Sequence, residues 1–311
     1  MPYPKVTVVG AGQVGATAAF LLVSKGLADV VLLDVAEGLP QGKSLDMMHS
    51  RSVELFSPTV VGTNDYADTQ GSDIVVVTAG LPRKPGMSRD DLLAANAGIV
   101  RSVVAGAVAA SPGALILCVT NPLDVMTYLA WKESGLPTQR VFGMGGVLDS
   151  ARFAYAIAEE TNKPMGSIQA VVCGAHGDAM VPMPRHSTVE GKSLVDVVDQ
   201  SRVEALCERT IRGGAEVVAL LKTGSAYYAP AASVVRMVQA VLGDTKESLS
   251  SCVYLSGEYG IRDVYVSVPA QLGREGVVSV TEMDLNAEEI DALRESAATI
   301  AASIEALGLR G

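Results

Sequence analysis

Three histidines occur in the chain, and His176 is the one whose neighbours suit proton transfer. It lies in the segment GAHGD, residues 174–178, directly after an apolar, strand-like run. The flanking glycines leave an imidazole at a strand end with room for a substrate, and histidine exchanges protons readily near neutral pH. His49 falls in a helical pattern and His186 in a segment rich in proline and arginine, so both are interpreted as structural or surface residues. A packed histidine without a chemical role is the alternative for His176.

The segment LDSAR, residues 148–152, places Asp149 and Arg152 three residues apart on an expected helix, so the two side chains share a face. A salt-bridged surface pair is the usual outcome of such spacing. In the alternative the two groups have separate tasks. Asp149 then orients His176 and stabilises its imidazolium form, while Arg152 holds a substrate carboxylate.

The segment LPRKPGMSR, residues 81–89, carries the cations Arg83, Lys84 and Arg89. Its two prolines and its glycine predict a loop that leaves the carboxyl end of a strand, where open α/β sheets bind their ligands. The planar guanidinium of arginine suits bidentate capture of a carboxylate or a phosphate. An ordinary solvated basic loop is the alternative.

The segment GAGQVG, residues 10–15, fits the pattern G-x-G-x-x-G between the first expected strand and the first expected helix. The first glycine allows a tight turn, the second lets a pyrophosphate approach the backbone, and the third lets helix and strand pack closely. Asp34 closes the second strand-like run, where a carboxylate can accept both adenosine ribose hydroxyls and repels a 2′-phosphate. No arginine or lysine lies between Asp34 and Gln41, so NAD is preferred over NADP. The predicted cofactor-binding residues here are Gly10, Gly12, Gln13, Val14, Gly15 and Asp34.

The segment VTNP, residues 119–122, ends the fourth expected strand at the same carboxyl edge. We predict that Val119 and Asn121 lie at the cofactor, with the Asn121 amide contacting substrate or nicotinamide. A simple turn residue before proline is the alternative for Asn121. For GAGQVG and Asp34 the alternative is a glycine turn beside a surface aspartate.

Alternating elements position these segments in the first half of the chain. Strand-like runs at 5–9, 29–33, 73–78, 114–119 and 140–142 alternate with helical patterns at 13–25, 41–56, 89–110 and 123–134. Near-continuous apolar strands separated by helices predict a doubly wound parallel sheet, the Rossmann class of α/β fold. We expect this NAD-binding domain to cover residues 1–145.

The second half, residues 146–311, is expected to form an α+β substrate domain. Helical patterns cover 148–161, 201–222, 227–242 and 286–307, with Asn286 as the N-cap of the last one. Strand-like runs lie at 168–173, 180–183, 187–189, 251–255, 264–268 and 277–280.

Composition limits the kinds of partner. At 311 residues the chain is long enough for two core-forming units, and its net charge of −10 disfavours nucleic acid. The four scattered cysteines, Cys118, Cys173, Cys207 and Cys252, predict neither a disulfide framework nor a metal site. The N-terminus does not resemble a signal peptide, and Ser111-Pro112-Gly113 interrupts the longest apolar stretch, so a cytoplasmic protein without membrane contact is expected.

The segments GAGQVG, LPRKPGMSR, VTNP, LDSAR and GAHGD, with Asp34 and GSAYY at 224–228, together resemble the lactate/malate dehydrogenase family over essentially the whole chain. More narrowly, they are similar to its malate dehydrogenases of the lactate-dehydrogenase-like type. The resemblance implies an NAD-dependent oxidoreductase that forms a homodimer or a homotetramer. It implies that His176 takes the hydroxyl proton, Asp149 partners His176, and Arg152 holds the C1 carboxylate. It further implies that Arg89 polarises the carbonyl as a loop closes, and that Asn121 contacts the reacting oxygen, Ser225 lines the substrate pocket and Asn96 lies near the cofactor.

Arg83 is the position that discriminates between substrates, because lactate-specific members carry a neutral glutamine there. The second carboxylate of oxaloacetate needs a cation once water is excluded, whereas pyruvate leaves the guanidinium partly unpaired. We therefore predict malate and oxaloacetate as substrates. The alternatives are a lactate or other 2-hydroxyacid dehydrogenase and, from another class, a catalytically silent NAD-binding regulatory or scaffold protein.

Overall fold

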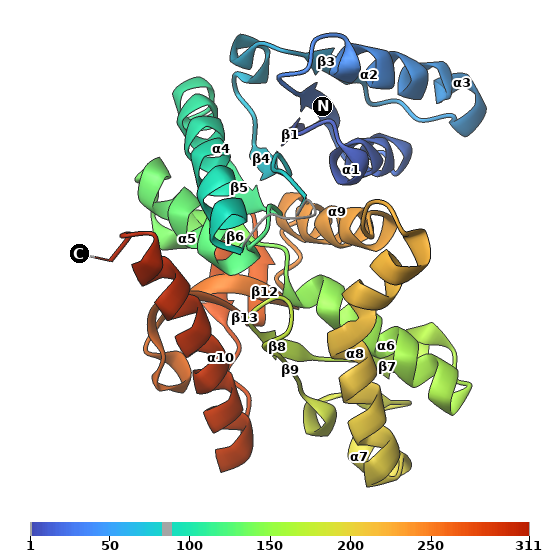
Figure 1. Cartoon of the computed structure of the whole chain (residues 1–311). Helices are drawn as coiled ribbons and strands as arrows, with labels where there is room; N and C mark the ends of the chain where they lie inside the picture. The colour runs from blue at the N-terminus through green and yellow to red at the C-terminus, as the bar shows by residue number, and fades with distance from the viewer. Residues whose placement is uncertain (1, 83–88, 311) are drawn as a thin grey trace. The chain divides into compact units, whose positions relative to one another are not determined.

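The computed structural model describes residues 2–82 and 89–310, which divide into two compact units (Figure 1). The first unit runs to Met144 and also includes Tyr227–Glu247 and Leu272–Val278. The second comprises Gly145–Ala226, Ser248–Gln271 and the chain from Ser279 onward. Two later segments of the chain thus belong to the first unit, a feature absent from the expected division at residue 145.

Parallel strands form the sheet of the first unit, in the order β3-β2-β1-β4-β5-β6. They are β1 (Lys5–Val9), β2 (Asp29–Leu33), β3 (Val60–Thr63), β4 (Ile74–Val77), β5 (Leu115–Cys118) and β6 (Val141–Gly143). All but β3 are buried along nearly their whole length, as strands covered on both faces must be. Val9 pairs with both Leu33 and Val77, so the strand order reverses around β1. The predicted Rossmann class is confirmed, and this reversal is where such sheets bind ligands.

Helices cover both faces of this sheet (Figure 1). Helix α4 contacts α5 on one side, and α1 contacts α9 on the other. The expected helix over 41–56 is interrupted: its first part ends at His49, and Leu55, with φ of 57°, ends a further short turn. The helices are α1 (Gln13–Ser24), α2 (Leu39–His49), α3 (Arg51–Glu54), α4 (Arg89–Ala110), α5 (Leu123–Ser134) and α9 (Tyr228–Leu242).

Within the described residues, one helical segment, Asp91–Ala110 of α4, is long and apolar enough to cross a membrane. The core helices of soluble proteins pass the same test of length and composition. Val100 and Val104 of this helix are fully buried in the first unit, so the apolar character of α4 has a structural explanation there.

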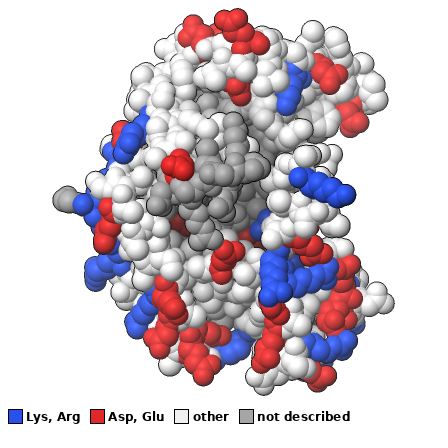
Figure 2. All heavy atoms as spheres, viewed as in Figure 1, with Lys and Arg blue, Asp and Glu red and all other residues white. Residues whose placement is uncertain are grey.

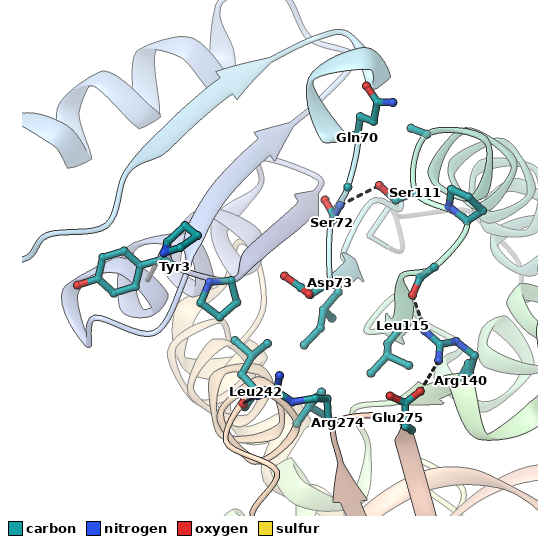
Figure 3. A pocket seen from close by; sticks show the side chains of 18 residues that line it. Tyr3, Gln70, Ser72, Asp73, Ser111, Leu115, Arg140, Leu242, Arg274 and Glu275 are labelled. Atoms are coloured by element: carbon teal, nitrogen blue, oxygen red, sulfur yellow. Dashed lines mark hydrogen bonds and ion pairs between the residues drawn. The ribbon is translucent and has the colours of Figure 1, made fainter.

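A depression of about 750 Å³ lies at the amino-terminal edge of the first sheet, the edge opposite the carboxyl ends of its strands (Figure 3). Its charged groups already have partners in the fold. Asp73 accepts the Lys5 backbone N–H at 2.8 Å, and Arg140 donates to Glu275 at 3.0 Å and to the carbonyl of Gly113. The depression therefore lies where residues 2–4 and the tip of the hairpin at 272–278 pack against the beginnings of the strands, and its charged groups serve the fold.

The second unit is mixed. Antiparallel pairs join β13 to β8 and β8 to β9, and β12 neighbours β13. A separate small sheet has the order β11-β10-β7. The remaining strands of the chain are β7 (Ile168–Gln169), β8 (Val172–Gly174), β9 (Met180–Pro182), β10 (Thr188–Val189), β11 (Lys192–Ser193), β12 (Glu247–Ser256), β13 (Arg262–Gly273) and β14 (Gly276–Val280). The tip of the β13–β14 hairpin, Leu272–Val278, belongs to the first unit. The single strand expected over 168–173 is thus two short strands in different sheets.

The helices of the second unit are α6 (Gly146–Thr161), α7 (Leu194–Val197), α8 (Gln200–Leu221) and α10 (Ala287–Ala306). Helices α6 and α8 pack together over a core that includes Phe153, Ile157 and Leu206. The predicted N-cap of α10 is confirmed, since Asn286 Oδ1 accepts the Glu289 backbone N–H at 2.9 Å. Glu289 returns the bond by accepting the Asn286 backbone N–H at 2.9 Å, which completes a capping box.

Charge is mixed over the surface. On the face drawn in Figure 2, the described Lys and Arg side chains are interspersed with Asp and Glu rather than gathered in one basic patch. The four cysteines, all within the described residues, form no disulfide, and Cys118, Cys173 and Cys252 are buried. Burial raises the pKa of Cys118 to about 12 and the pKa of Cys207 to about 11. Such thiols carry little thiolate at neutral pH and behave as small apolar side chains.

Candidate active site

The glycine segment of the first unit forms a cradle between β1 and α1. Gly10 has φ of +107°, and a Cβ on Gly15 would lie 1.9 Å from the Gly10 carbonyl oxygen, so both positions need glycine. A Cβ on Gly12 would meet no described atom within 4 Å, which leaves open space beside the backbone. Helix α1 begins at Gln13 without a side-chain cap. Its first N–H groups therefore fit a pyrophosphate, with Gln13 exposed and Val14 half-buried next to them.

Two side chains that sequence reasoning missed hold this cradle. Thr78, at the end of β4, donates from Oγ1 toward the carbonyls of Val9 and Gly10, each at 3.0 Å. Lys43 of α2 donates from Nζ to the Ala11 carbonyl at 2.8 Å. The position of Thr78 at a strand end was the available signal, whereas nothing in the local pattern marks Lys43.

Asp34 lies at the end of β2, half-buried, with both carboxylate oxygens directed by backbone groups. Oδ2 accepts the Ala11 N–H at 2.6 Å, and Oδ1 accepts the Ala36 N–H at 2.9 Å. The carboxylate is thereby tied to the glycine segment itself. A carboxylate oxygen has more than one acceptor site, so these bonds leave capacity for ribose hydroxyls.

Asn96 is buried in α4, with 1% exposure, and ties together two loops at the carboxyl edge of the sheet. Its Oδ1 accepts the Leu81 N–H at 2.8 Å, while Nδ2 donates to the Asn121 carbonyl at 2.7 Å and to the Leu81 carbonyl at 3.2 Å. The side chain thus positions the loop that carries Asn121, which is exposed; the preceding Val119 is half-buried. A direct cofactor contact by Asn96 stays a prediction.

The second unit brings the three predicted groups His176, Asp149 and Arg152 together. His176 Nδ1 lies 2.8 Å from Asp149 Oδ2, and Arg152 Nη1 donates to Asp149 Oδ1 at 3.0 Å. The Asp149 side chain is 2% exposed, against 15% for His176 and 19% for Arg152. A buried carboxylate therefore joins a base to a cation, and both of these reach the surface.

Local folding explains the arrangement. Asp149 lies in the first turn of α6, where the helix dipole favours a negative charge. Ser150, the next residue, accepts the Val172 backbone N–H at 3.0 Å and so fixes α6 against β8. His176 follows β8 between Gly174 and Gly177, which have φ of +85° and +115°. Positive φ at both glycines lets the chain turn sharply around the imidazole.

Ser296 of α10 is a buried residue that sequence reasoning missed. Its Oγ accepts the Ala175 backbone N–H at 2.8 Å and donates to the Ala179 carbonyl at 2.5 Å. These two bonds close the loop that carries His176 from both sides. The residue lies 121 positions from Ala175 in the chain, so no local pattern could have revealed it.

The remaining predicted residues are placed less fully. Ser225 is exposed in the segment between α8 and α9. Arg83 and Lys84 lie outside the described residues, and so does the side chain of Arg89, whose backbone begins α4. Among the residues that the structure describes, no group of three or more His, Cys, Asp or Glu is arranged to hold a metal ion.

Comparison with known proteins gives a consistent result over both units. The lactate/malate dehydrogenase NAD-binding domain matches residues 4–143, and the lactate/malate dehydrogenase alpha/beta C-terminal domain matches residues 146–308. The chain is 51% identical over 302 residues to a malate dehydrogenase of Trichormus variabilis, covering 97% of this chain and 93% of that one.

Two solved structures illustrate the likeness of the fold. Malate dehydrogenase from Salinibacter ruber has a TM-score of 0.94 at 46% identity, covering 98% of this chain and 97% of that chain. A lactate dehydrogenase of Cryptosporidium parvum, solved with lactic acid and β-nicotinamide adenine dinucleotide, has a TM-score of 0.96 at 40% identity, covering 100% of both chains. The backbone alone therefore does not separate a relative named for malate from one named for lactate.

Proposed function

This chain belongs to the lactate/malate dehydrogenase family, and on that premise we infer that it is an NAD-dependent malate dehydrogenase, interconverting (S)-malate and oxaloacetate. The observation that carries the chemistry is the buried carboxylate of Asp149, with one oxygen at His176 and the other at Arg152. A proton acceptor and a carboxylate-binding cation joined in this way suit a substrate with a hydroxyl next to a carboxylate, which is a 2-hydroxy acid.

The glycine cradle and Asp34 are the residues that would hold NAD. When bound, NAD supplies a two-electron acceptor for the hydrogen on C2 of the substrate. The N-terminus of α1 and the open space at Gly12 would receive the pyrophosphate, and Asp34 would receive the adenosine ribose. Lys43 lies two residues after Gln41, beyond the stretch from Asp34 that contains no lysine or arginine. Its ammonium donates to the Ala11 carbonyl. These contacts support NAD rather than NADP.

His176 acts as the proton acceptor. Asp149 is acceptor-only when ionised, so the 2.8 Å contact assigns the Nδ1 proton to His176 and leaves the Nε2 lone pair to take the substrate hydroxyl proton. The imidazolium that results is stabilised by the same carboxylate, which the burial of Asp149 and its first-turn position on α6 keep in place. In the reverse direction His176 returns the proton to the carbonyl oxygen.

Arg152 holds the C1 carboxylate. Its Nη1 is fixed by Asp149, and a guanidinium has further N–H groups in the same plane for a bidentate carboxylate. We assign Arg89 to polarising the carbonyl, Asn121 to the reacting oxygen and Ser225 to the pocket wall. These three roles rest on the family and on the position of each residue in the sequence motifs.

We assign the choice of a dicarboxylate to Arg83. The test compares kcat/KM for oxaloacetate and pyruvate in the parent and in Arg83→Gln, with the neighbouring Lys84→Gln as the matched control. The parent should favour oxaloacetate. Arg83→Gln should lower that preference by about 100-fold, because the second carboxylate of oxaloacetate, shut off from water, loses its charged partner. Lys84→Gln should leave the ratio unchanged.

Three results would contradict these assignments separately. A parent that favours pyruvate would replace malate with lactate as the substrate. An unchanged ratio in Arg83→Gln would remove Arg83 from the specificity. A parent that binds NADH but oxidises it with neither substrate would make the chain a silent cofactor-binding protein.

We also propose that the enzyme is a cytoplasmic homo-oligomer. Leu45, Val53 and Leu55 around α2 and α3 are 57%, 78% and 82% exposed, an apolar surface of the kind that a second copy covers. Cysteines that form no disulfide are in keeping with a reducing compartment. Sedimentation equilibrium should give a multiple of the 32.2 kDa chain mass, and a mass of one chain would refute the oligomer.

A further inference from the structure

Two consecutive glycines, Gly213 and Gly214, occupy the interior of α8, a helix of 22 residues. Glycine weakens a helix interior relative to alanine, because the unfolded chain then has more conformational freedom to lose. Neither residue has a positive φ, so the backbone conformation does not require glycine at either position. The reason for the pair therefore lies in what the glycines face.

Both glycines face one side chain, that of Arg152. A Cβ on Gly213 would lie 3.3 Å from Arg152 Cδ, with Cγ and Nε each at 3.8 Å. A Cβ on Gly214 would lie 3.5 Å from Arg152 Nη2, with Cζ and Nη1 each at 3.7 Å. The end of the arginine thus lies along the two glycines, its stem over Gly213 and its guanidinium over Gly214.

The other side of Arg152 is fixed by a buried charge. Nη1 donates to Asp149 Oδ1 at 3.0 Å, and the second oxygen of Asp149 is engaged by His176. A side chain added at position 213 would crowd the arginine stem while Asp149 restrains its end. The guanidinium would then have to turn or shift away from the orientation in which it could pair with a substrate carboxylate.

We propose that Gly213 and Gly214 form a shelf that positions the Arg152 guanidinium for the substrate carboxylate. The shelf rests on the proposed function, since it assumes that Arg152 binds that carboxylate. Gly213 is the more demanding position, because 3.3 Å is tighter than ordinary van der Waals contact, whereas 3.5 Å at Gly214 is ordinary. Both act through Arg152 and are positioning residues rather than catalytic ones.

Close helix packing is the rival explanation, and the structure gives two observations against it. For a Cβ at either glycine, the three nearest atoms all belong to the Arg152 side chain, and none of them is a backbone atom of α6. The helix pair also has its own anchors. Arg209 pairs with Glu159 at 2.8 Å, and Arg202 pairs with Glu160 at 2.5 Å.

The experiment compares Gly213→Ala and Gly214→Ala with Gly98→Ala. Gly98 is an exposed helix-interior glycine of α4, where a Cβ would meet no described atom within 4 Å. The KM for oxaloacetate should rise about fivefold in Gly213→Ala with kcat changed less than about twofold, since a carboxylate contact weakens equally in the ground and transition states. The KM in Gly214→Ala should rise less, about two- to threefold, because its contact with Arg152 is the looser of the two. The KM in the control Gly98→Ala should stay at the parent value.

Thermal unfolding separates positioning from packing. Under the shelf proposal, Tm in Gly213→Ala is unchanged or raised, because alanine is the better helix former. A protein that unfolds at lower temperature with its KM unchanged, or that cannot be isolated, would assign the glycine to packing and overturn the proposal. A KM in Gly213→Ala equal to that of the parent would also overturn the proposal, whatever its Tm.

A second background tests whether the effect passes through Arg152. In Arg152→Ala, adding Gly213→Ala should change kcat/KM less than about twofold, because the side chain that it crowds is gone. The same fivefold loss in both backgrounds would overturn the shelf. If the parent itself does not reduce oxaloacetate with NADH, the proposed function fails. That result differs from any change of KM or Tm in the variants, which presupposes an active parent.

Discussion

The cofactor cradle and the acid–base site are built in different ways, although each lies at the end of a strand. In the first unit the cradle is mostly backbone, and its six residues are contiguous from the end of β1 into the first turn of α1. In the second unit the site is made of side chains from α6 and the loop after β8, with support from α8 and α10. Function thus depends on close backbone packing in one unit and on a long-range side-chain network in the other.

The largest effect expected from this difference is at the side-chain site. Replacing His176 by Asn removes the proton acceptor while keeping a polar group of similar size. We expect kcat/KM for malate oxidation to fall about 10³- to 10⁴-fold, because general base catalysis is lost. The dissociation constant of NADH, measured by fluorescence, should change little, since the cradle lies in the other unit. Substantial remaining turnover would remove His176 from the mechanism.

The cradle should respond to a single added methyl group. In Gly15→Ala the Cβ would lie 1.9 Å from the Gly10 carbonyl oxygen, a backbone atom that cannot turn aside. We expect a loss of about 1–3 kcal/mol in the free energy of unfolding, as for other overpacked sites, together with weaker NADH binding.

Gly12→Ala is the matched control, because its Cβ meets no described atom within 4 Å. It should keep its stability in urea unfolding and still bind NADH more weakly, since the methyl group takes space meant for the pyrophosphate. Equal stability loss in the two variants would contradict the division of roles among the glycines.

A smaller effect on turnover than at His176 is expected at Ser296. Alanine there leaves the Ala175 N–H and the Ala179 carbonyl without their partner, and the His176 loop loses its closure. We expect kcat to fall about tenfold and the free energy of unfolding to fall by about 1–3 kcal/mol. Ser303→Ala, on the same helix, removes a hydroxyl that donates to the Thr299 carbonyl within that helix, and it should leave kcat intact. A parent-like kcat in Ser296→Ala would show that the backbone alone holds the loop.

The same contrast explains how far the sequence could be interpreted. The range expected for β1, and those expected for α4 and α5, agree with the structure, because their apolar pattern and their turn residues are local signals. Strand β3 was missed, since it is short and only half its residues are buried. The run 168–173 divides between two sheets because its halves pair with different partners, β10 and β13, which no local pattern reveals.

The site follows the same rule. Asp149, Arg152 and His176 were found because each lies in a recognisable segment, and the structure brings them together. Ser296 and the glycine shelf were missed because their importance arises from contacts with residues far away in the chain. The assignment of α9 to the first unit was missed for the same reason: its apolar face predicts burial but does not say against which helix.

The division of the Asp149 carboxylate between His176 and Arg152 also bears on how this scaffold can evolve. A mutation that changes either His176 or Arg152 also shifts the Asp149 carboxylate that holds the other residue. Few substitutions in α6 can therefore change the substrate without loss of activity. Inherited variation in substrate choice should instead accumulate at positions outside this network, such as Arg83. A family whose members named for malate and for lactate keep one backbone is the outcome that such a constraint favours.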